Sequence, residues 1–556
     1  MAINLSNLTF TDEDDIVPQS GVVEAIVNTS IANTLAGNDV ITSISTDFNY
    51  GIHNLGIINT SDGNDIITVY VLYNDYQGII DTGNGNDIIR GAAIGNGLRG
   101  IIDTGNGDDI ITGTSIGQEN REIGVANGIT NRAYYDDISY GIKTGDGNDT
   151  LTGTGYSSGI VSNGAIDTGS GDDIITGTGG NWGYLNGGGI LNTSDGNDTI
   201  TGISTESNTG NGFDNSGSMN TGDGDDIITG ISSAIDLSSE GSGLKNSLNR
   251  SGLDTGNGND IITGISNKDG INNYYSTINT GNGDDSIIAN GGLNGIDNYG
   301  TINTGNGDDS IIADGNNAGV NLGNTYNVAS MDTGSGNDTI TGSGNIGISN
   351  NSDSIIDTGD GKDIITGSGI TSGINSQGMI NTGHDDDSII SQGKLINSGG
   401  IFLGEGNDSI IADTDFPGRT LENFNAIETN EGNDTITSAG VIYNEGVINT
   451  DNGNDSIIAN GGFESAPNSS GAWFLGEGED YIKGFGSGDF YGGSGNDTLE
   501  LTPGTYTVGI WGEGGESPIF TKGDKLMITS EFEKLKAGTT IYDFTSLTVG
   551  QIITVA

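Results

Sequence analysis

The sequence predicts an all-β fold, a parallel β-helix of about 19 coils with a cap at each end. A turn built on the pattern Gly-x-Gly-Asn/Asp-Asp, with substitutions in some copies, recurs nineteen times, from the copy ending at Asp39 to the copy ending at Asp497. The seventeen intervals between Asp39 and Asp480 average about 26 residues, a period typical of solenoids whose units bury apolar side chains against their neighbours. Short runs rich in isoleucine and valine flank the turns and leave no room for helices.

A typical unit is Ile166-Asp-Thr-Gly-Ser-Gly-Asp-Asp-Ile-Ile-Thr-Gly177, with a β-branched stretch on each side of a glycine-rich turn. A second element, Gly-x-x-Asn, recurs between the acidic turns, as in Gly51–Asn54, Gly212–Asn215 and Gly347–Asn350, and predicts another corner. Two or three short strands and these corners use about 25 residues, which favours a β-helix coil over a propeller blade of about 40. Stacking then predicts ladders of isoleucine inside and of asparagine at the corners, with amides bonded from coil to coil.

The composition excludes several classes of partner and site. The formal charge is −59, from 16 Lys and Arg against 75 Asp and Glu, so the chain lacks the clustered cations that nucleic acids require. It has no cysteine, which excludes disulfides, thiolate metal sites and thiol nucleophiles. Glycine supplies 101 residues and proline 5, so the glycines belong to turns rather than to collagen or a proline-rich linker. Oxygen ligands and cations are the expected chemistry.

Stacked acidic turns need a positive partner. Equivalent carboxylates of adjacent coils would lie about 5 Å apart, which is closer than the Debye length of about 8 Å in physiological salt. Alternating glycines let the turn carbonyls point toward one place, and the final aspartate adds a carboxylate. Calcium prefers such ligands, whereas magnesium needs tighter octahedral geometry and retains its waters. The turns therefore predict bound Ca²⁺. The alternative is that Asp and Asn only form hydrogen bonds in the turns, without metal.

The repeats resemble those of the RTX, or haemolysin-type, calcium-binding proteins. The closest match to that family's nonapeptide is Tyr491-Gly-Gly-Ser-Gly-Asn-Asp-Thr-Leu499, and the resemblance covers roughly residues 33 to 500. In that family calcium lies between consecutive turns, held by turn carbonyls and by the aspartate. The resemblance implies carboxylate ligands at Asp39, Asp65, Asp87, Asp109, Asp149, Asp173, Asp198, Asp226, Asp260, Asp285, Asp309, Asp338, Asp363, Asp387, Asp408, Asp434, Asp455, Asp480, Asp489 and Asp497. It implies glycine ligands at Gly85, Gly107, Gly147, Gly171, Gly196, Gly224, Gly258, Gly283, Gly307, Gly336 and Gly495.

The sequence departs from the family in its spacing. Nearly every coil carries one acidic turn, whereas tandem nonapeptides place a turn every nine residues on both edges. We therefore expect one file of calcium along a larger β-helix, with an RTX β-roll confined to residues 476–500. Three copies are expected to be weak or empty sites: Leu35-Ala-Gly-Asn-Asp39 lacks a glycine, Gly383-His-Asp-Asp-Asp387 replaces one, and Gly361-Lys-Asp363 introduces a cation.

The predicted domains are an N-terminal cap (1–30), the β-helix with calcium-binding turns (31–475), the β-roll-like segment (476–500) and a C-terminal cap (501–556). The start lacks the basic and apolar regions of a cleavable signal peptide, and no run of about 18 apolar residues predicts a transmembrane segment. The last segment, which contains Lys522, Lys525, Lys534 and Lys536, resembles the C-terminal regions of RTX proteins exported by type I secretion. That resemblance implies an extracellular protein that folds on calcium binding, and a plain cap is the alternative.

The leading functional hypothesis is a structural protein of a bacterial cell surface, sheath, S-layer or matrix, or an adhesin. It resembles the RTX-type surface proteins of bacteria including filamentous cyanobacteria, and its expected partners are calcium, further copies of itself, cell-surface polysaccharide and the type I secretion machinery.

An enzyme such as a β-helix lyase, hydrolase or epimerase is one alternative, but His53 and His384 are the only histidines and neither accompanies a nucleophile, so no enzymatic activity is expected. An ice- or carbohydrate-binding solenoid is the other. It would present the threonines before the turn glycines: Thr82, Thr104, Thr168, Thr255, Thr280, Thr304, Thr333 and Thr358.

Overall fold

The computed structural model describes residues 3–17, 25–43, 50–115, 126–132, 140–206, 210–233, 241–247, 252–324, 326–413, 418–466, 471–511 and 517–556. The chain forms two units, Met1–Asn303 (unit 1) and Thr304–Ala556 (unit 2). Apart from the 3₁₀ turns η1 (Leu5–Asn7) and η2 (Phe544–Ser546), the regular structure of the described residues is strand. In this part of the chain no helix is long and apolar enough to span a membrane.

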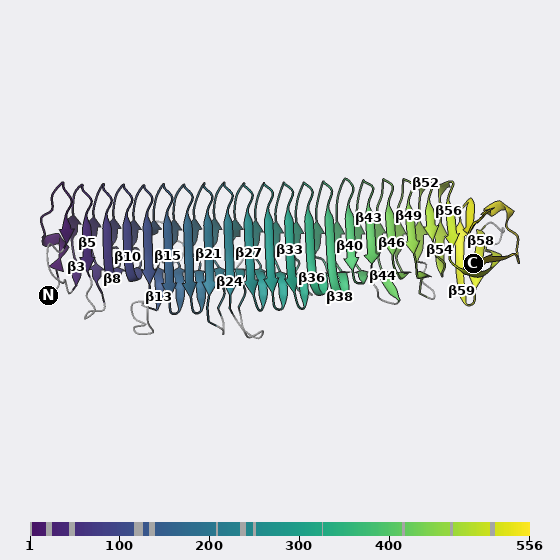
Figure 1. Cartoon of the computed structure of the whole chain (residues 1–556), viewed down its shortest axis with the longest axis horizontal. Coiled ribbons are helices and arrows are strands. Elements are labelled where there is room, and N and C mark those ends of the chain that lie inside the picture. The colour runs from purple at the N-terminus through teal and green to yellow at the C-terminus, as the bar shows by residue number, and fades with distance from the viewer. Residues whose placement is uncertain are drawn as a thin grey trace. The chain divides into compact units, whose positions relative to one another are not determined.

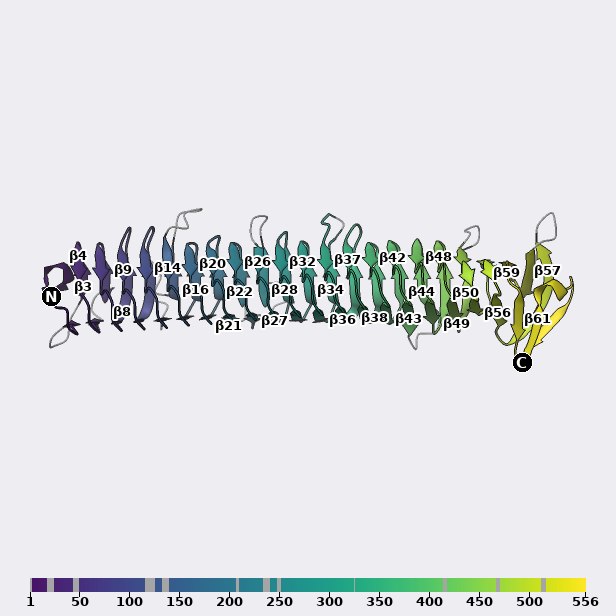
Figure 2. The same ribbon diagram turned by 90° about the horizontal axis from the view of Figure 1, so that it is seen from above.

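Each coil has three strand positions. In the coil that follows Asp149, the first strand is β15 (Thr150–Gly155), the second is β16 (Ser158–Ser162) and the third is β17 (Ala165–Asp167), and the turn Thr168–Asp173 leads to the next coil. Every strand pairs in parallel with its equivalent in the adjacent coil, as β15 does with β18 and β17 with β20. Figure 2 shows the third strands of unit 1 as one row and the second and first strands as others. The all-β parallel solenoid is confirmed.

In unit 1 the first-position strands follow the acidic turns, which line up along the upper edge in Figure 1. They are β2 (Ile16–Val17), β5 (Val40–Ser43), β8 (Ile66–Asn74), β10 (Ile88–Asn96), β12 (Ile110–Thr114), β15, β18 (Ile174–Gly179), β21 (Thr199–Ser204), β24 (Ile227–Ser232), β27 (Ile261–Ser266) and β30 (Ser286–Gly291). Strands β8 and β10 run on into the second position. The separate second strands are β1 (Ile3–Asn4), β3 (Ile26–Asn28), β6 (Ile52–Asn54), β13 (Asn127–Asn131), β16, β19 (Trp182–Asn186), β22 (Phe213–Asn215), β25 (Leu244–Ser247), β28 (Asp269–Tyr274) and β31 (Asn294–Asn298). The third strands are β4 (Ile31–Asn33), β7 (Ile57–Asn59), β9 (Ile79–Asp81), β11 (Ile101–Asp103), β14 (Gly141–Lys143), β17, β20 (Ile190–Asn192), β23 (Ser218–Asn220), β26 (Gly252–Asp254), β29 (Thr277–Asn279) and β32 (Thr301–Asn303).

Unit 2 follows the same plan and ends in a cap. Its first strands are β33 (Ser310–Gly315), β36 (Thr339–Asn350), β38 (Ile364–Ser376), β40 (Ser388–Gln392), β43 (Ser409–Asp413), β46 (Thr435–Ser438), β49 (Ser456–Ala459), β53 (Tyr481–Lys483) and β56 (Thr498–Leu501), of which β36 and β38 include the second position. The second strands are β34 (Ala318–Leu322), β41 (Leu395–Asn397), β44 (Arg419–Asn423), β47 (Val441–Asn444) and β50 (Gly462–Glu464). The third strands are β35 (Ser330–Asp332), β37 (Ile355–Asp357), β39 (Met379–Asn381), β42 (Gly400–Phe402), β45 (Ala426–Glu428), β48 (Val447–Asn449), β51 (Ala472–Phe474) and β54 (Gly488–Tyr491). The cap contains β57 (Gly504–Trp511), β58 (Ser517–Lys522), β59 (Lys525–Ser530), β60 (Lys534–Ala537), β61 (Thr540–Asp543) and β62 (Ile552–Val555).

The described residues form a parallel solenoid of about 17 turns, close to the predicted 19 coils. The acidic turns at Asp480 and Asp497 lie where the parallel coils give way to the cap, in which β57, β58 and β59 pair antiparallel. In the predicted β-roll-like segment, β52 (Glu477–Gly478) pairs in parallel with β55 (Ser494–Gly495), and β53 pairs with β56. At the other end, the described part of residues 1–30 adds the parallel strands β1 and β2 to the stack.

The predicted ladders are present inside the coils. Isoleucines alternate with outward-facing residues along each strand, and side chains such as Ile160, Ile166 and Ile175 are fully buried. At the corner after the second strand, Asn28 Nδ2 donates to Asn54 Oδ1 at 2.9 Å and Asn54 Nδ2 donates to Asn74 Oδ1 at 2.8 Å. Such bonds satisfy amides that would otherwise be buried without partners.

Paired glycines bring the first and second strands of one coil into backbone contact. A Cβ atom on Gly177 would lie 2.3 Å from the carbonyl oxygen of Gly183, and one on Gly202 would lie 2.3 Å from that of Gly212. These pairs explain why both repeated sequence elements contain a glycine that is not in the acidic turn.

Replacing Gly177 by alanine is expected to destabilise unit 1 by about 2 kcal/mol, because the added methyl group overlaps backbone that cannot move aside. The control is Gly252→Ala, where the nearest atom to an added Cβ is 3.9 Å away. Urea unfolding with calcium present measures both, and equal stability of the two variants would contradict the close contact.

Candidate metal centre

The acidic turns are held together by bonds between coils. In the turn Thr168–Asp173, Thr168 N donates to Asn192 O and Gly171 N donates to Asp195 O, each at 3.0 Å. Gly171 has a φ of 141°, and a Cβ atom on it would lie 1.9 Å from Gly147 O in the preceding coil. The equivalent glycines have the same conformation. Glycine is therefore needed here both for its positive φ and for the close approach of successive turns.

The predicted aspartates line up in one file per unit and bond to one another. The backbone N–H of each donates to Oδ1 of its equivalent in the next coil, as from Asp149 to Asp173 and from Asp173 to Asp198, both at 2.8 Å. The file of unit 1 contains Asp39, Asp65, Asp87, Asp109, Asp149, Asp173, Asp198, Asp226, Asp260 and Asp285. That of unit 2 contains Asp309, Asp338, Asp363, Asp387, Asp408, Asp434, Asp455, Asp480 and Asp497. None of these residues is more than 2% exposed.

The second carboxylate oxygen of most of these aspartates accepts no hydrogen bond of good geometry, although the hydroxyl of the turn threonine lies near the carboxyl group and lowers its pKa. Asp260 is different, because Thr255 Oγ1 donates to its Oδ2 at 2.5 Å. Oδ2 is buried and accepts no hydrogen bond from the described chain in Asp39, Asp65, Asp87, Asp109, Asp149, Asp173, Asp198, Asp226, Asp338, Asp363, Asp387, Asp408, Asp434, Asp455, Asp480 and Asp497. In these sixteen aspartates, turn hydrogen bonding thus explains one carboxylate oxygen and leaves the other unsatisfied. A buried charged oxygen without a donor is costly unless a cation or a proton neutralises it.

Burial also changes how these carboxyl groups ionise. It raises the pKa of Asp109 and Asp173 to about 8 and that of Asp87 to about 7. The turn threonine and a backbone N–H lower the pKa of each of these groups, but by less than burial raises it. The charges of the neighbouring aspartates in the file raise these pKa values further. Without a counter-ion, part of the file is therefore protonated at neutral pH. A bound divalent cation would hold it ionised.

The donor set fits a hard cation that accepts backbone ligands. Among the described residues, no three His, Cys, Asp or Glu side chains form a group that could hold a metal ion. Each predicted site would therefore consist of one or two aspartate Oδ2 atoms together with turn carbonyl groups. Calcium accepts such mixed oxygen ligands, and the absence of a carboxylate cluster fits magnesium or a transition metal less well.

Two further residues extend the files, and the turn motif identifies neither of them. Asp15 N donates to Asp39 Oδ1 at 2.8 Å, so Asp15 occupies the position before Asp39. Its turn, Thr11–Asp15, has neither glycine, and only the spacing of 24 residues signals it. At the other end, Glu533 Oε2 accepts the N–H of Asp497 at 2.8 Å. Its distance of 36 residues gives no periodic signal.

The residue before each file aspartate forms a second ladder in the opposite direction. Asn86 N donates to Asn64 Oδ1 and Asn64 N donates to Asn38 Oδ1, each at 2.8 Å. This bond explains why the position is Asn or Asp in nearly every copy. At the exceptional Lys362, the ammonium group pairs with Asp386 at 2.5 Å.

The copies expected to be weak keep their aspartates in the file. Leu35 replaces the first turn glycine and has a φ of 68°, and Asp385 replaces the second with a φ of 82°. The backbone of both residues adopts a left-handed conformation that is unfavourable for residues other than glycine. The structure thus retains the aspartate position of these copies at a cost in backbone strain. Asp489 differs, since it lies on β54, paired with Ala472 and Ile528, and is not part of the file.

The threonines before the turn glycines point inward. Thr82 and Thr104 are at most 1% exposed, and Thr82 Oγ1 donates to Thr104 O at 3.3 Å. The equivalent residues Thr168, Thr255, Thr280, Thr304, Thr333 and Thr358 are also buried. The turn threonines therefore stabilise the stack and do not form an outward file.

A different set of threonines faces outward on the first strands of unit 1. The registers of β12, β15, β18, β21, β24 and β27 align eighteen outward positions, all of them Thr or Ile. We call this set the Thr/Ile face: Ile110, Thr112, Thr114, Thr150, Thr152, Thr154, Ile174, Thr176, Thr178, Thr199, Thr201, Ile203, Ile227, Thr229, Ile231, Ile261, Thr263 and Ile265. It carries no charge in a chain with 75 acidic residues. Arg90 on β10 and Asn290 on β30 bound it.

The two histidines do not form a catalytic group with a nucleophile in the described contacts. His53 Nε2 lies 2.8 Å from Asp75 Oδ2, and its ring stacks on that of Tyr50 at 5.0 Å and lies tilted against that of Tyr73 at 5.6 Å. His384 lies in an acidic turn, 4.0 Å from Asp360.

Comparison with known proteins places the chain in no family. No family model matches it, and no curated protein matches it. It is similar to a solved structure described as a hyperactive, Ca²⁺-dependent, beta-helical antifreeze protein from an Antarctic bacterium. The two are 15% identical, the match covers 77% of this chain and 84% of that one, and the TM-score is 0.27. The resemblance to RTX proteins therefore rests on the turn motif.

Proposed function

We propose that the protein is a non-enzymatic, calcium-dependent structural solenoid of the extracellular surface or matrix. The observation that carries the proposal is the file of buried aspartates, most of whose Oδ2 atoms accept no hydrogen bond of good geometry from the described chain. Within each file, Oδ1 holds the neighbouring coil and Oδ2 with the turn carbonyls would hold the ion. Bound calcium would supply the positive charge that makes a fully ionised file compatible with burial.

The proposed extracellular location is supported by the same coupling of calcium binding to folding. A cation that binds only the folded form stabilises it in proportion to its concentration. Low cytosolic calcium would leave the chain unfolded for export through a type I system, and calcium outside the cell would drive folding. The partners proposed with it are further copies of the chain and cell-surface polysaccharide.

Calorimetric titration of the metal-free protein with calcium tests the proposal directly. We expect multiple ions per chain and a gain of strand signal in circular dichroism, with little response to equimolar magnesium. On intact cells, chelator treatment should release the protein from the surface. Fewer than two bound calcium ions, or a purely cytosolic pool, would refute the corresponding part of the proposal.

A second candidate function, ice binding, is favoured by the Thr/Ile face. Its threonine hydroxyls and methyl groups repeat about every 4.8 Å between coils and about every 7 Å along a strand. It has no aromatic or arginine side chains, which usually anchor protein interfaces. A neutral array of this regularity is suited to ordered water at an ice surface.

Thermal hysteresis of the calcium-loaded protein measures ice binding. We expect the native chain to show hysteresis and Thr201→Tyr to lose at least about half of it, because the bulky ring interrupts the array. The control is Thr277→Tyr, which places the same ring on the third-strand face of unit 1. No hysteresis in the native protein, or equal activity of both variants, would exclude this candidate.

A further inference from the structure

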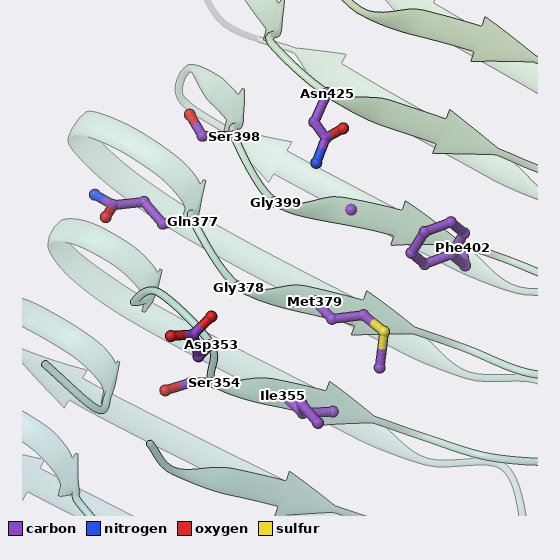
Figure 3. A pocket seen from close by; sticks show the side chains of 11 residues that line it. Asp353, Ser354, Ile355, Gln377, Gly378, Met379, Ser398, Gly399, Phe402 and Asn425 are labelled. Carbon is purple, nitrogen blue, oxygen red and sulfur yellow. The ribbon is translucent and has the colours of Figure 1, made fainter. Parts of the chain in front are cut away.

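We propose that a recess on the third-strand face of unit 2 binds a neutral polysaccharide. This recess has a volume of about 470 Å³ and crosses the corners that precede β37, β39, β42 and β45. Figure 3 shows Phe402 at one end, Asp353, Gln377 and Ser398 toward the other, and Asn425 alongside. The inference rests on the proposed function in that it locates the polysaccharide partner.

The recess lies where the repeat is broken. The last residue of the third strand is acidic or Asn in β35, β37, β39, β45 and β48, but it is Phe402 in β42. The first residue of the same strand is Gly400, whereas β39 has Met379 there. A Cβ atom on Gly400 would lie 2.4 Å from Cε2 of Phe402, so the ring covers the space that a side chain would need. One coil therefore exposes part of an aromatic ring beside bare backbone.

Several polar side chains around the recess keep hydrogen-bonding groups that the stack does not use. Elsewhere on this face amides bond along it, as Asn381 Nδ2 does to Asp357 Oδ1 at 2.8 Å. Gln377 Oε1 accepts from Ser352 Oγ at 3.2 Å, and its amide N–H₂ group makes no hydrogen bond within the described chain. Within the described chain, the side chains of Ser398 and Asn425 make no hydrogen bond. The recess thus offers an amide donor, an amide with both donor and acceptor, and a hydroxyl.

The aromatic ring and the amide groups of the recess indicate which kind of ligand it would bind. A pyranose ring presents an apolar face of C–H groups, which an aromatic ring covers, and hydroxyls at its edge, which amides bind through both oxygen and nitrogen. Asp353 is the charged side chain among the described lining residues, and the chain carries −59, so an anionic polymer would be repelled. Equivalent backbone positions recur at the coil spacing of about 4.8 Å, which suits a polymer with repeated hydroxyl groups.

Affinity gel electrophoresis in calcium-containing buffer tests the proposal with laminarin, hydroxyethylcellulose and galactomannan as neutral polymers and polygalacturonate as the acidic one. At least one neutral polymer should retard the protein, and polygalacturonate should not. Phe402→Asn restores the usual residue of this face and should weaken the retardation at least about tenfold. Gln377→Ala should weaken it less, by about threefold.

The matched control is Phe474→Asn, which removes an exposed ring at the same position of β51, where it stacks on Tyr491 outside the recess. This variant should bind like the native chain. Absence of retardation by every neutral polymer, equal binding by Phe402→Asn and native protein, or retardation by polygalacturonate alone would overturn the proposal. Circular dichroism and calcium titration of the same samples keep this outcome separate from that of calcium-dependent folding.

Discussion

Removal of calcium with EGTA at pH 8 is expected to abolish most of the strand signal in circular dichroism, and excess calcium is expected to restore it. Without calcium, the file aspartates must either ionise while buried or take up protons. Burial raises the pKa of most of them in the folded chain, to about 6 for Asp65 and about 8 for Asp109, against an ordinary value of 3.8. At pH 8 most of the file would be ionised and self-repelling, so the folded form loses its stability.

The raised pKa values predict that the metal-free protein loses stability as the pH rises. A carboxyl group whose pKa is higher in the folded chain contributes stability below its unfolded pKa and loses it as the pH rises through the folded pKa. The metal-free protein is therefore expected to be more stable at pH 5 than at pH 8, with a difference in melting temperature of about 10 °C or more. With saturating calcium the dependence should reverse, because protons then compete with the ion. A metal-free protein that melts at the same temperature at both pH values would contradict the buried, donor-free carboxylates.

Much of the fold could be predicted from the sequence because its main determinants repeat. The spacing of the aspartates gave the parallel stack, and the recurrent Gly-x-x-Asn gave the corner ladder that Asn28, Asn54 and Asn74 form. Repetition could not reveal which way a side chain points. The turn threonines repeat as strictly as the aspartates, yet they are buried, whereas the outward threonines of the first strands were not singled out.

Features that occur once could not be predicted from the repeat pattern either. Asp15 and Glu533 extend the files but lie in segments without turn glycines, so the turn motif does not identify them, whereas their hydrogen bonds to Asp39 and Asp497 do. The same holds for the recess at Phe402, which exists because one coil departs from its neighbours. A motif search averages over copies and removes such departures. The pairing of strands between adjacent coils is needed to show that the substituted positions of the recess lie side by side.

Replacing Asp173 by asparagine is expected to change stability in opposite directions with and without calcium. The asparagine side chain would keep an Oδ1 acceptor for the backbone N–H of Asp149, which lies 2.8 Å from Oδ1 of the native aspartate, so the bond between coils remains. The substitution would remove the buried charge at a position where the aspartate pKa is about 8. In EGTA above pH 8 the variant should therefore melt a few degrees higher than the native chain, because less charge is buried without a counter-ion.

With saturating calcium the same variant should bind one or two fewer ions and melt about 5 °C lower, because the sites on either side of the coil lose a charged ligand. The control is Asp172→Asn, which alters the adjacent, exposed residue of the same turn; Asp172 Oδ1 accepts the N–H of Asn197, and the amide oxygen can do the same. This control should lose no ions and show no crossover. Calorimetry and thermal melts of the three proteins under both conditions separate the two interpretations of the file: if its aspartates served only as hydrogen-bond acceptors, Asp173→Asn would leave the calcium stoichiometry unchanged.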